Sequence, residues 1–115
     1  MRRGEVWWVN LEPAHPGEAD KTRPCVIVSN DANNVTAQRL GRGVVTIAPL
    51  TTSTSKVFAF QVLVPARVAG LEVDSKIQTE QVRTVAVNRL GKRIGSLPID
   101  LRDRVDRALR LHLAL

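Results

Sequence analysis

The sequence has few of the residues that cross-link a chain, bind metals or enter membranes. Among its 115 residues are one cysteine, two histidines and no tyrosine. A lone cysteine forms no internal disulfide, and one cysteine with two distant histidines does not suit a zinc site. The apolar stretches are all interrupted within a few residues by charge or proline, which excludes a membrane-spanning helix. We therefore expect no membrane partner, no metal and no other cofactor.

The start of the chain lacks the apolar core of a signal peptide. Met1 is followed by two arginines, a glycine and a glutamate. The single cysteine agrees with a reducing compartment, so we expect a cytoplasmic protein. Hydrophobic residues make up 43% of the chain, enough for one core at this length. We expect a single domain spanning residues 1–115.

Charge is the most marked compositional feature. Seventeen basic residues outnumber eleven acidic ones, giving a net charge of +6 and a sequence pI of about 10.7. Thirteen of the basic residues are arginine, whose planar guanidinium suits phosphate groups. This composition favours a nucleic-acid or acidic-peptide partner, although a genome rich in arginine codons would produce the same bias.

Short β-prone segments alternate with turn-forming ones along most of the chain. Strands are expected over 5–11, 24–30, 44–50, 57–66 and 76–87, with a further short strand around Arg93 and Ile94. Residues 12–23 contain two prolines and a glycine and read as a long loop. Residues 30–43 predict a turn, or one helical turn capped by Asn30 or Asp31, followed by a bend marked by glycine. The pattern predicts a mainly β protein, a small antiparallel barrel with a C-terminal α-helix.

The C-terminal helix is predicted over residues 99–115. Leucine or valine recurs every fourth residue from Leu101 to Leu113, which makes one apolar stripe. Asp100 is the expected N-cap. Leu111, Ala114 and Leu115 widen the apolar surface beyond one stripe, and either a dimer contact or a frayed helix end accounts for this.

Three polar segments at strand ends, residues 18–23, 51–56 and 80–84, are candidates for a common site. They contain arginines, hydroxyls, carboxylates and an amide. Cleavage of RNA needs little more, because the 2′-hydroxyl is an internal nucleophile beside its own phosphodiester. The products of this metal-independent route are a 2′,3′-cyclic phosphate and a 5′-hydroxyl.

Within this set, Arg23 suits the role of a clamp on a phosphate oxygen. Pro24 restricts the backbone of Arg23 to extended geometry. An arginine is not readily deprotonated, so acid donation or electrostatic stabilisation is expected rather than general-base action. Thr51 offers a hydroxyl to the same phosphate, and the proton acceptor is left open between Glu18, the substrate and water.

Ordinary structural roles explain the same residues. Arg23 suits an ion-paired loop residue, and residues 51–55 suit a turn with local side-chain hydrogen bonds. Glu80 and Arg83 suit a cross-strand ion pair. A ribonuclease with two catalytic histidines is disfavoured because the two histidines lie in a proline-bordered loop and near a helix end, and Cys25 suits core packing.

The order of several segments resembles the MazF/PemK family of toxin endoribonucleases. "RRGEVWWVNLEP" is similar to the family's opening strand, and "GE" at 17–18 followed by "RPCVIVSND" to its loop and second strand. "VVTIAPLTTS" and "TEQVRTV" are similar to its third strand and its late strand with a glutamine. "RVDRALRLHLAL" resembles its C-terminal helix.

This resemblance implies an SH3-like barrel that forms a homodimer and cleaves single-stranded RNA at a short sequence without a metal. It also implies a cognate antitoxin with a disordered, acidic tail. The family's catalytic arginine and threonine fall on Arg23 and Thr51. The residues expected to bind RNA are Glu18, Lys21, Thr52, Ser53, Lys56, Gln81 and Arg83.

The loop departs from the family pattern at Ala19 and Asp20, which concerns cleavage specificity more than activity. Thr52 and Ser53 also compete with Thr51 for the catalytic role. Two alternative functions are a non-enzymatic, CcdB-like inhibitor of DNA gyrase and an inactive barrel that binds RNA or peptide. The first uses an aromatic anchor at the helix end, where this chain has Leu113, Ala114 and Leu115.

Overall fold

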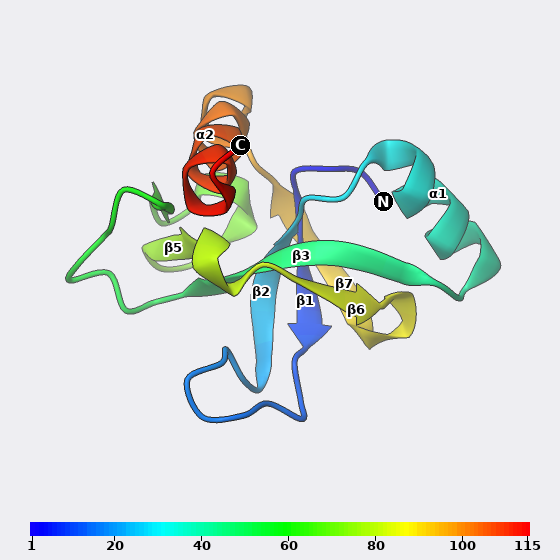
Figure 1. Ribbon diagram of the computed structural model, residues 1–115. Coiled ribbons are helices and arrows are strands. Elements are labelled where there is room, and N and C mark those ends of the chain that lie inside the picture. The colour runs from blue at the N-terminus through cyan, green and yellow to red at the C-terminus, as the bar shows by residue number, and fades with distance from the viewer.

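The structure is a computed structural model that describes residues 1–115. It contains seven β-strands and two α-helices (Figure 1). The strands are β1 (Glu5–Asn10), β2 (Thr22–Ile27), β3 (Val44–Thr51), β4 (Gln61–Val64), β5 (Ser75–Gln78), β6 (Arg83–Ala86) and β7 (Leu90–Ser96). The helices are α1 (Asp31–Leu40) and α2 (Ile99–Leu113), and three single 3₁₀ turns are η1 (Val68–Gly70), η2 (Thr79–Gln81) and η3 (Val87–Arg89).

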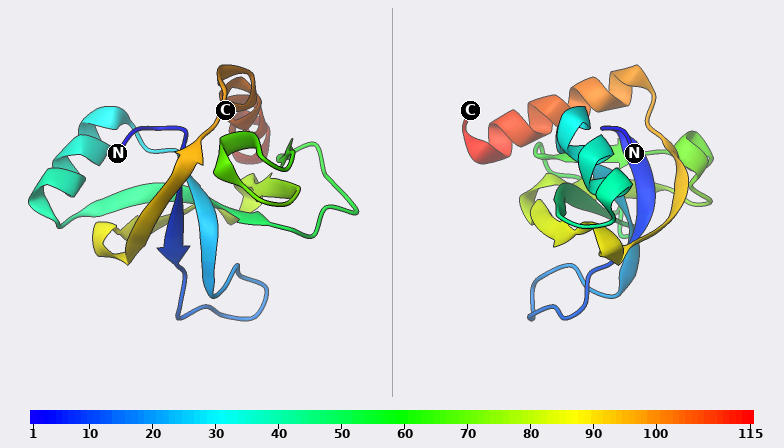
Figure 2. Two further views of the ribbon diagram at one scale, coloured as in Figure 1. Left: turned by 180° about the vertical axis from the view of Figure 1, so that it is seen from behind. Right: turned by 90° about the vertical axis from the view of Figure 1, so that its right-hand side faces the viewer.

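All strands pair antiparallel in the order β4-β5-β3-β2-β1-β7, and β6 pairs with the free part of β3. This confirms the expected mainly β architecture with a C-terminal helix. The end strands β4 and β7 do not pair, so the sheet curls without closing into a hydrogen-bonded cylinder. Turn η1 packs against β7 at this opening, as the view from behind in Figure 2 shows.

Two glycines allow that contact. A Cβ on Gly95 would collide with the carbonyl group of Ala69, and a Cβ on Gly70 would lie 2.5 Å from the carbonyl oxygen of Ile94. Gly70 also has a φ of +79°, which disfavours residues with a side chain. The approach of η1 to β7 therefore depends on both residues.

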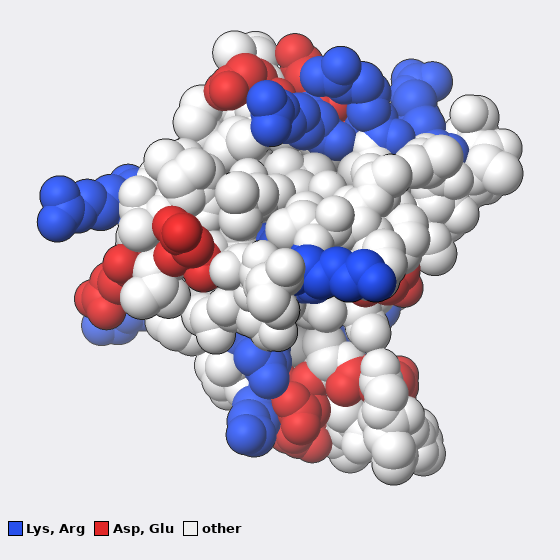
Figure 3. Space-filling model, turned by 90° about the vertical axis from the view of Figure 1, so that its left-hand side faces the viewer, with Lys and Arg blue, Asp and Glu red and all other residues white.

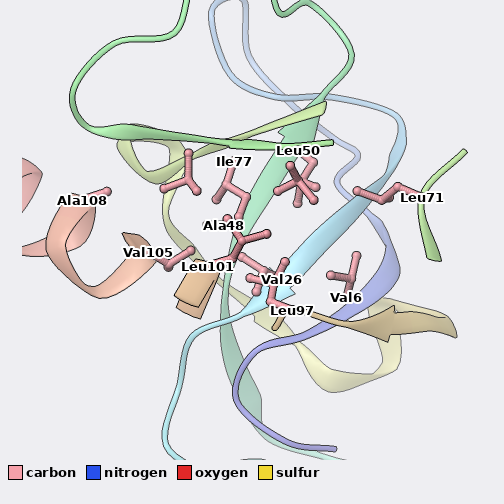
Figure 4. Packing of buried hydrophobic residues seen from close by; sticks show 12 residues of the cluster. Val6, Val26, Ala48, Leu50, Leu71, Ile77, Leu97, Leu101, Val105 and Ala108 are labelled. Carbon is pink, nitrogen blue, oxygen red and sulfur yellow. The ribbon is translucent and has the colours of Figure 1, made fainter. Parts of the chain in front are cut away.

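The central strands bury side chains on both faces, as expected for residues 24–30. One face of β1, β2 and β3 packs against α2 through a cluster that includes Val6, Val26, Leu50, Leu101 and Val105 (Figure 4). The opposite face forms a second cluster. That cluster contains Val9, Leu11, Cys25, Ile27, Ala37, Val45, Ile47, Val85 and Val87. Pro24 lies inside β2 rather than at its start. Pairing between β2 and β3 begins only at the next residue, Cys25.

Helix α1 is longer than the single turn expected after Asn30. Asn30 caps it by accepting a hydrogen bond from the backbone N–H of Asn33 at 2.9 Å, and Gly41 ends it with a φ of 65°. The interior is polar and carries no clear apolar stripe, which is why the sequence concealed its length. Asn34 is fully buried and donates to the carbonyl oxygen of Ser29 at 2.8 Å.

Two expected strands have different bounds. Only Gln61–Val64 of the strand predicted over 57–66 pairs, so Phe58 and Phe60 lie in the preceding loop rather than in a strand. Turn η2 divides the strand predicted over 76–87 into β5 and β6. The division lets β5 pair with the last residues of β3 and β6 with its first ones.

Helix α2 has Pro98 as its N-cap residue, so the expectation of Asp100 in that position is wrong; Asp100 lies in the first turn. Leu101, Val105 and Ala108 are buried against the sheet. Leu111, Leu113 and Leu115 are exposed at the end of the chain. Neither α-helix is long and apolar enough to cross a membrane.

Candidate functional site

The loop between β1 and β2 is ordered by its own acidic side chains. The Glu12 carboxylate accepts hydrogen bonds from the backbone N–H groups of Lys21 at 2.8 Å and Ala14 at 3.2 Å. The Glu18 carboxylate accepts one from the N–H of His15 at 2.7 Å. These contacts fold residues 12–21 into a defined lobe beyond the sheet (Figure 1).

Gln81, in turn η2, fastens this loop to the body of the protein. Its Oε1 accepts a hydrogen bond from the backbone N–H of Ala19 at 3.1 Å, and its Nε2 donates to the carbonyl oxygen of Gly17 at 3.1 Å. Both ends of the amide are therefore engaged with backbone groups 62 and 64 residues away in sequence.

A pocket of about 240 Å³ lies between the loop and the strand ends. Its lining contains two glutamines, Arg23, Thr51 and the tip of the loop. The full lining is Gly17, Glu18, Ala19, Asp20, Arg23, Thr51, Gln78 and Gln81. The β2–β3 ladder ends where Cys25 faces Pro49, and Arg23 and Thr51 each lie two residues beyond that pair on the same face of their strands.

Arg23 is held in this pocket by Asp20. Its Nε donates to the Asp20 carbonyl oxygen at 3.0 Å, and its Nη2 lies 3.2 Å from the Asp20 carboxylate. A guanidinium has five N–H groups, so three remain for a ligand. The ion pair considered from the sequence is thus present, although Arg23 lies in β2 rather than in a loop, and its guanidinium still has donors for a phosphate.

Thr51 is the last residue of β3. Its Oγ1 accepts a hydrogen bond from the backbone N–H of Ser53 at 3.3 Å, which leaves the hydroxyl hydrogen free to donate. Thr51 also faces Lys76 across the β3–β5 ladder. Of the nine predicted site residues, this pocket brings together Glu18, Arg23, Thr51 and Gln81.

The other five do not line this pocket. Thr52 lines a separate pocket of about 350 Å³ that also contains Trp8 and Val73. Lys21 and Ser53 are exposed, Lys56 lies 4.7 Å over the Phe58 ring, and Arg83 donates to the carbonyl oxygen of Leu11 at 3.4 Å. Their role in binding RNA stays a prediction.

The structure decides two of the ordinary structural roles considered from the sequence, those of Glu80 with Arg83 and of Cys25. Glu80 accepts a hydrogen bond from the Gln61 Nε2 at 2.7 Å and forms no ion pair with Arg83, so the predicted cross-strand pair is wrong. Cys25 is fully buried, which confirms its packing role. Burial raises the pKa of the Cys25 thiol to about 12, against the opposing influence of Arg83 and Arg23.

Sequence reasoning did not identify Gln78 or Lys76. Both point to the face of β5 that carries the pocket, because Lys76 faces Thr51 and side chains alternate along a strand. The alternation was visible in the sequence, but the partner strand was not. No group of three or more His, Cys, Asp or Glu side chains is placed to share a metal ion.

Comparison with protein families and curated proteins identifies related chains. Residues 2–113 match the model of the PemK-like, MazF-like toxins of type II toxin–antitoxin systems. The chain is 51% identical over 115 residues to Endoribonuclease MazF9 of Mycobacterium tuberculosis, covering 100% of this chain and 98% of the relative. It is 33% identical over 116 residues to Endoribonuclease EndoA of Bacillus subtilis, covering 100% and 96%.

Solved structures share the fold. MazF from Deinococcus radiodurans superposes with a TM-score of 0.79 at 23% identity, covering 100% of this chain and 97% of that one. A mycobacterial endoribonuclease in complex with its cognate antitoxin gives 0.77 at 21% identity, covering 100% and 96%. Since the family model spans nearly the whole chain and a relative shares half of its residues, the resemblance is confirmed: this chain belongs to the PemK-like, MazF-like toxins of type II toxin–antitoxin systems.

Proposed function

We propose that this chain is a sequence-specific, metal-independent endoribonuclease that cleaves single-stranded RNA. The observation that carries the proposal is the pocket in which Arg23 and Thr51 meet, each with hydrogen-bond donors that no protein group uses. The relatives named above as endoribonucleases support the same reaction class.

In the proposed reaction the 2′-oxygen attacks the adjacent phosphorus, and the bond from phosphorus to the 5′-oxygen breaks. Arg23 stabilises the negative charge that develops on the non-bridging oxygens, and Thr51 donates a hydrogen bond to the same phosphate. The 2′-proton passes to Glu18, water or the substrate, and the leaving 5′-oxygen takes up one proton from water. The products are a 2′,3′-cyclic phosphate and a 5′-hydroxyl.

The biological setting belongs to the same proposal. Residues 1–115 form a single toxin domain that acts in the cytoplasm and is neutralised by a cognate antitoxin with an acidic, disordered tail. A net charge of +6 favours such a tail, and basic side chains gather over α2 on the face shown in Figure 3. The exposed leucines at the end of α2 support a homodimer.

Replacement of Arg23 by alanine tests the proposal. Purified protein is incubated with a mixed RNA pool, and new 5′-hydroxyl ends are mapped. Arg23→Ala should reduce cleavage by at least 100-fold while circular dichroism stays unchanged, because one preorganised donor to a developing oxyanion contributes about that factor. Arg42→Ala, at the opposite end of β3, removes the same charge and should cleave normally.

Two further measurements separate the endoribonuclease from the alternative functions. EDTA should leave cleavage unchanged, and DNA of the same sequence should stay intact because it lacks the 2′-hydroxyl. Full activity of Arg23→Ala would refute the assignment of the site. Absence of new RNA ends with the unaltered protein, together with inhibition of DNA gyrase, would favour the CcdB-like alternative instead.

A further inference from the structure

Lys76 is a buried cation without a carboxylate partner. The residue is 8% exposed, and its Nζ donates to the backbone carbonyl oxygen of Lys56 at 2.6 Å. None of the four ion pairs in the structure includes it. An ammonium group has three donors, so two remain beyond the bond to Lys56. Buried charges in proteins are normally paired, which makes this one a candidate for binding an anion.

The position of Lys76 connects it with the proposed active site. It is the direct cross-strand neighbour of Thr51 in the β3–β5 ladder, so the two side chains leave the sheet on the same face. Gln78, two residues further along β5, lines the pocket that holds Arg23. The bond to Lys56 places the ammonium against the loop that follows Thr51.

A second ammonium group lies close by. The Nζ atoms of Lys56 and Lys76 lie 4.7 and 6.0 Å from the centre of the Phe58 ring, whose other neighbour is Phe60 with ring centres 5.4 Å apart. The ring attracts both cations through its electron-rich face, but it neutralises neither. Two positive charges near one ring, neither in an ion pair with a carboxylate, make this part of the protein favourable for an anion.

We infer that Lys76 binds a backbone phosphate of single-stranded RNA next to the phosphate held by Arg23 and Thr51. Lys56 supports this contact from the loop. The inference rests on the proposed function, since it assigns a second contact to the same substrate. The competing explanation is that Lys76 only clamps the loop through the Lys56 carbonyl group.

Charge and hydrogen bonding are separated by replacing Lys76 with glutamine. Gln keeps an N–H donor, one bond nearer the backbone than the lysine ammonium, but has no charge, whereas Lys76→Arg keeps the charge. Binding is measured with RNA that carries a 2′-deoxy sugar at the cleavage site, over a range of salt concentrations. Each phosphate contact to a single strand adds about 0.7 to the slope of log K against log salt.

We expect Lys76→Gln to lose about 0.7 of that slope and about tenfold in affinity at low salt. Its kcat should stay within a factor of about three, because a neighbouring phosphate is bound equally in ground and transition states. Lys76→Arg should restore the slope, and Arg42→Gln should leave it unchanged. An unaltered slope in folded Lys76→Gln would overturn the inference and leave only the clamp.

A measurement on the unaltered protein covers the case in which the glutamine variant does not fold. The chain has four lysines, so their Cε–H signals are few, and that of Lys76 should shift when the uncleavable RNA is added. A signal that does not move at saturation would also overturn the inference. The proposed function fails separately: unaltered protein that binds RNA without cleaving it refutes the endoribonuclease, while the salt slopes still report on Lys76.

Discussion

The two hydrogen bonds of Gln81 to the β1–β2 loop should control the activity of Arg23, because they hold that loop in place. In Gln81→Leu, both bonds to the β1–β2 loop are lost, those to the Ala19 N–H and the Gly17 carbonyl oxygen. Each bond contributes about 0.5–1.5 kcal/mol net, so roughly 1–3 kcal/mol of loop anchoring disappears. The base of the loop stays attached, because the backbone N–H of Leu11 donates to the Lys21 carbonyl oxygen at 2.8 Å.

A more mobile loop should also displace Arg23, because Asp20 follows Ala19 in the loop and accepts both hydrogen bonds from the Arg23 guanidinium. If the lost anchoring energy appears fully in the transition state, kcat/KM falls by about 5- to 150-fold, since 1.4 kcal/mol corresponds to a factor of ten. The melting temperature should fall as well, by about 4–8 °C for each kcal/mol of lost anchoring, so the variant is assayed at a temperature where circular dichroism shows it folded.

Cleavage of a fluorogenic RNA measures kcat/KM, and hydrogen exchange at the Ala19 amide reports the loop. Gln81→Glu is the graded control, since it keeps the acceptor for Ala19 but has no donor for Gly17, and Thr84→Val is a neutral change at an exposed position nearby. Faster exchange at Ala19 with unaltered kcat/KM would refute the link between loop order and Arg23. Unaltered exchange would show that Gln81 does not hold the loop.

Two further predictions concern the fold. Gly95→Ala should lower the melting temperature by several degrees, because overpacking against the Ala69 carbonyl group costs about 1–3 kcal/mol. Gly91→Ala is the control and should not lower it, since the added Cβ would lie 3.6 Å from Trp8. Equal melting temperatures of the two variants would contradict the close approach of η1 to β7. Cys25 should not react with a disulfide reagent at pH 8 in the native protein and should react once the protein is denatured. Burial raises the pKa of its thiol to about 12 and keeps the reagent away from it. Labelling of the folded protein at the rate of a free thiol would contradict this prediction.

The elements that the sequence predicted well are those where local pattern and tertiary role agree. The apolar residues of β2 indicated a central strand, and its side chains do enter clusters on both faces. The spacing of Leu101 and Val105 indicated the buried side of α2. Arg23 and Thr51 were assigned to one phosphate from their residue types and again from the resemblance, and the structure shows both of them lining one pocket.

The remaining features depend on contacts that local patterns do not contain. Turn η2 interrupts an apparently continuous strand because β3 needs different partners along its length. The polar interior of α1 hid the length of the helix, although Asn30 was one of the two expected caps and a glycine bend was expected where Gly41 ends it. Lys76 looked like an ordinary strand residue, since its burial depends on the loop that carries Lys56.

The contact between Asp20 and Arg23 has a consequence for which anions the pocket accepts. A carboxylate already sits 3.2 Å from the guanidinium, so an arriving small anion meets repulsion together with attraction. Free nucleotides and inorganic phosphate gain nothing elsewhere to offset this, whereas a polymer adds contacts along its length. The acidic side chain beside Arg23 therefore makes the pocket favour long RNA chains over small anions.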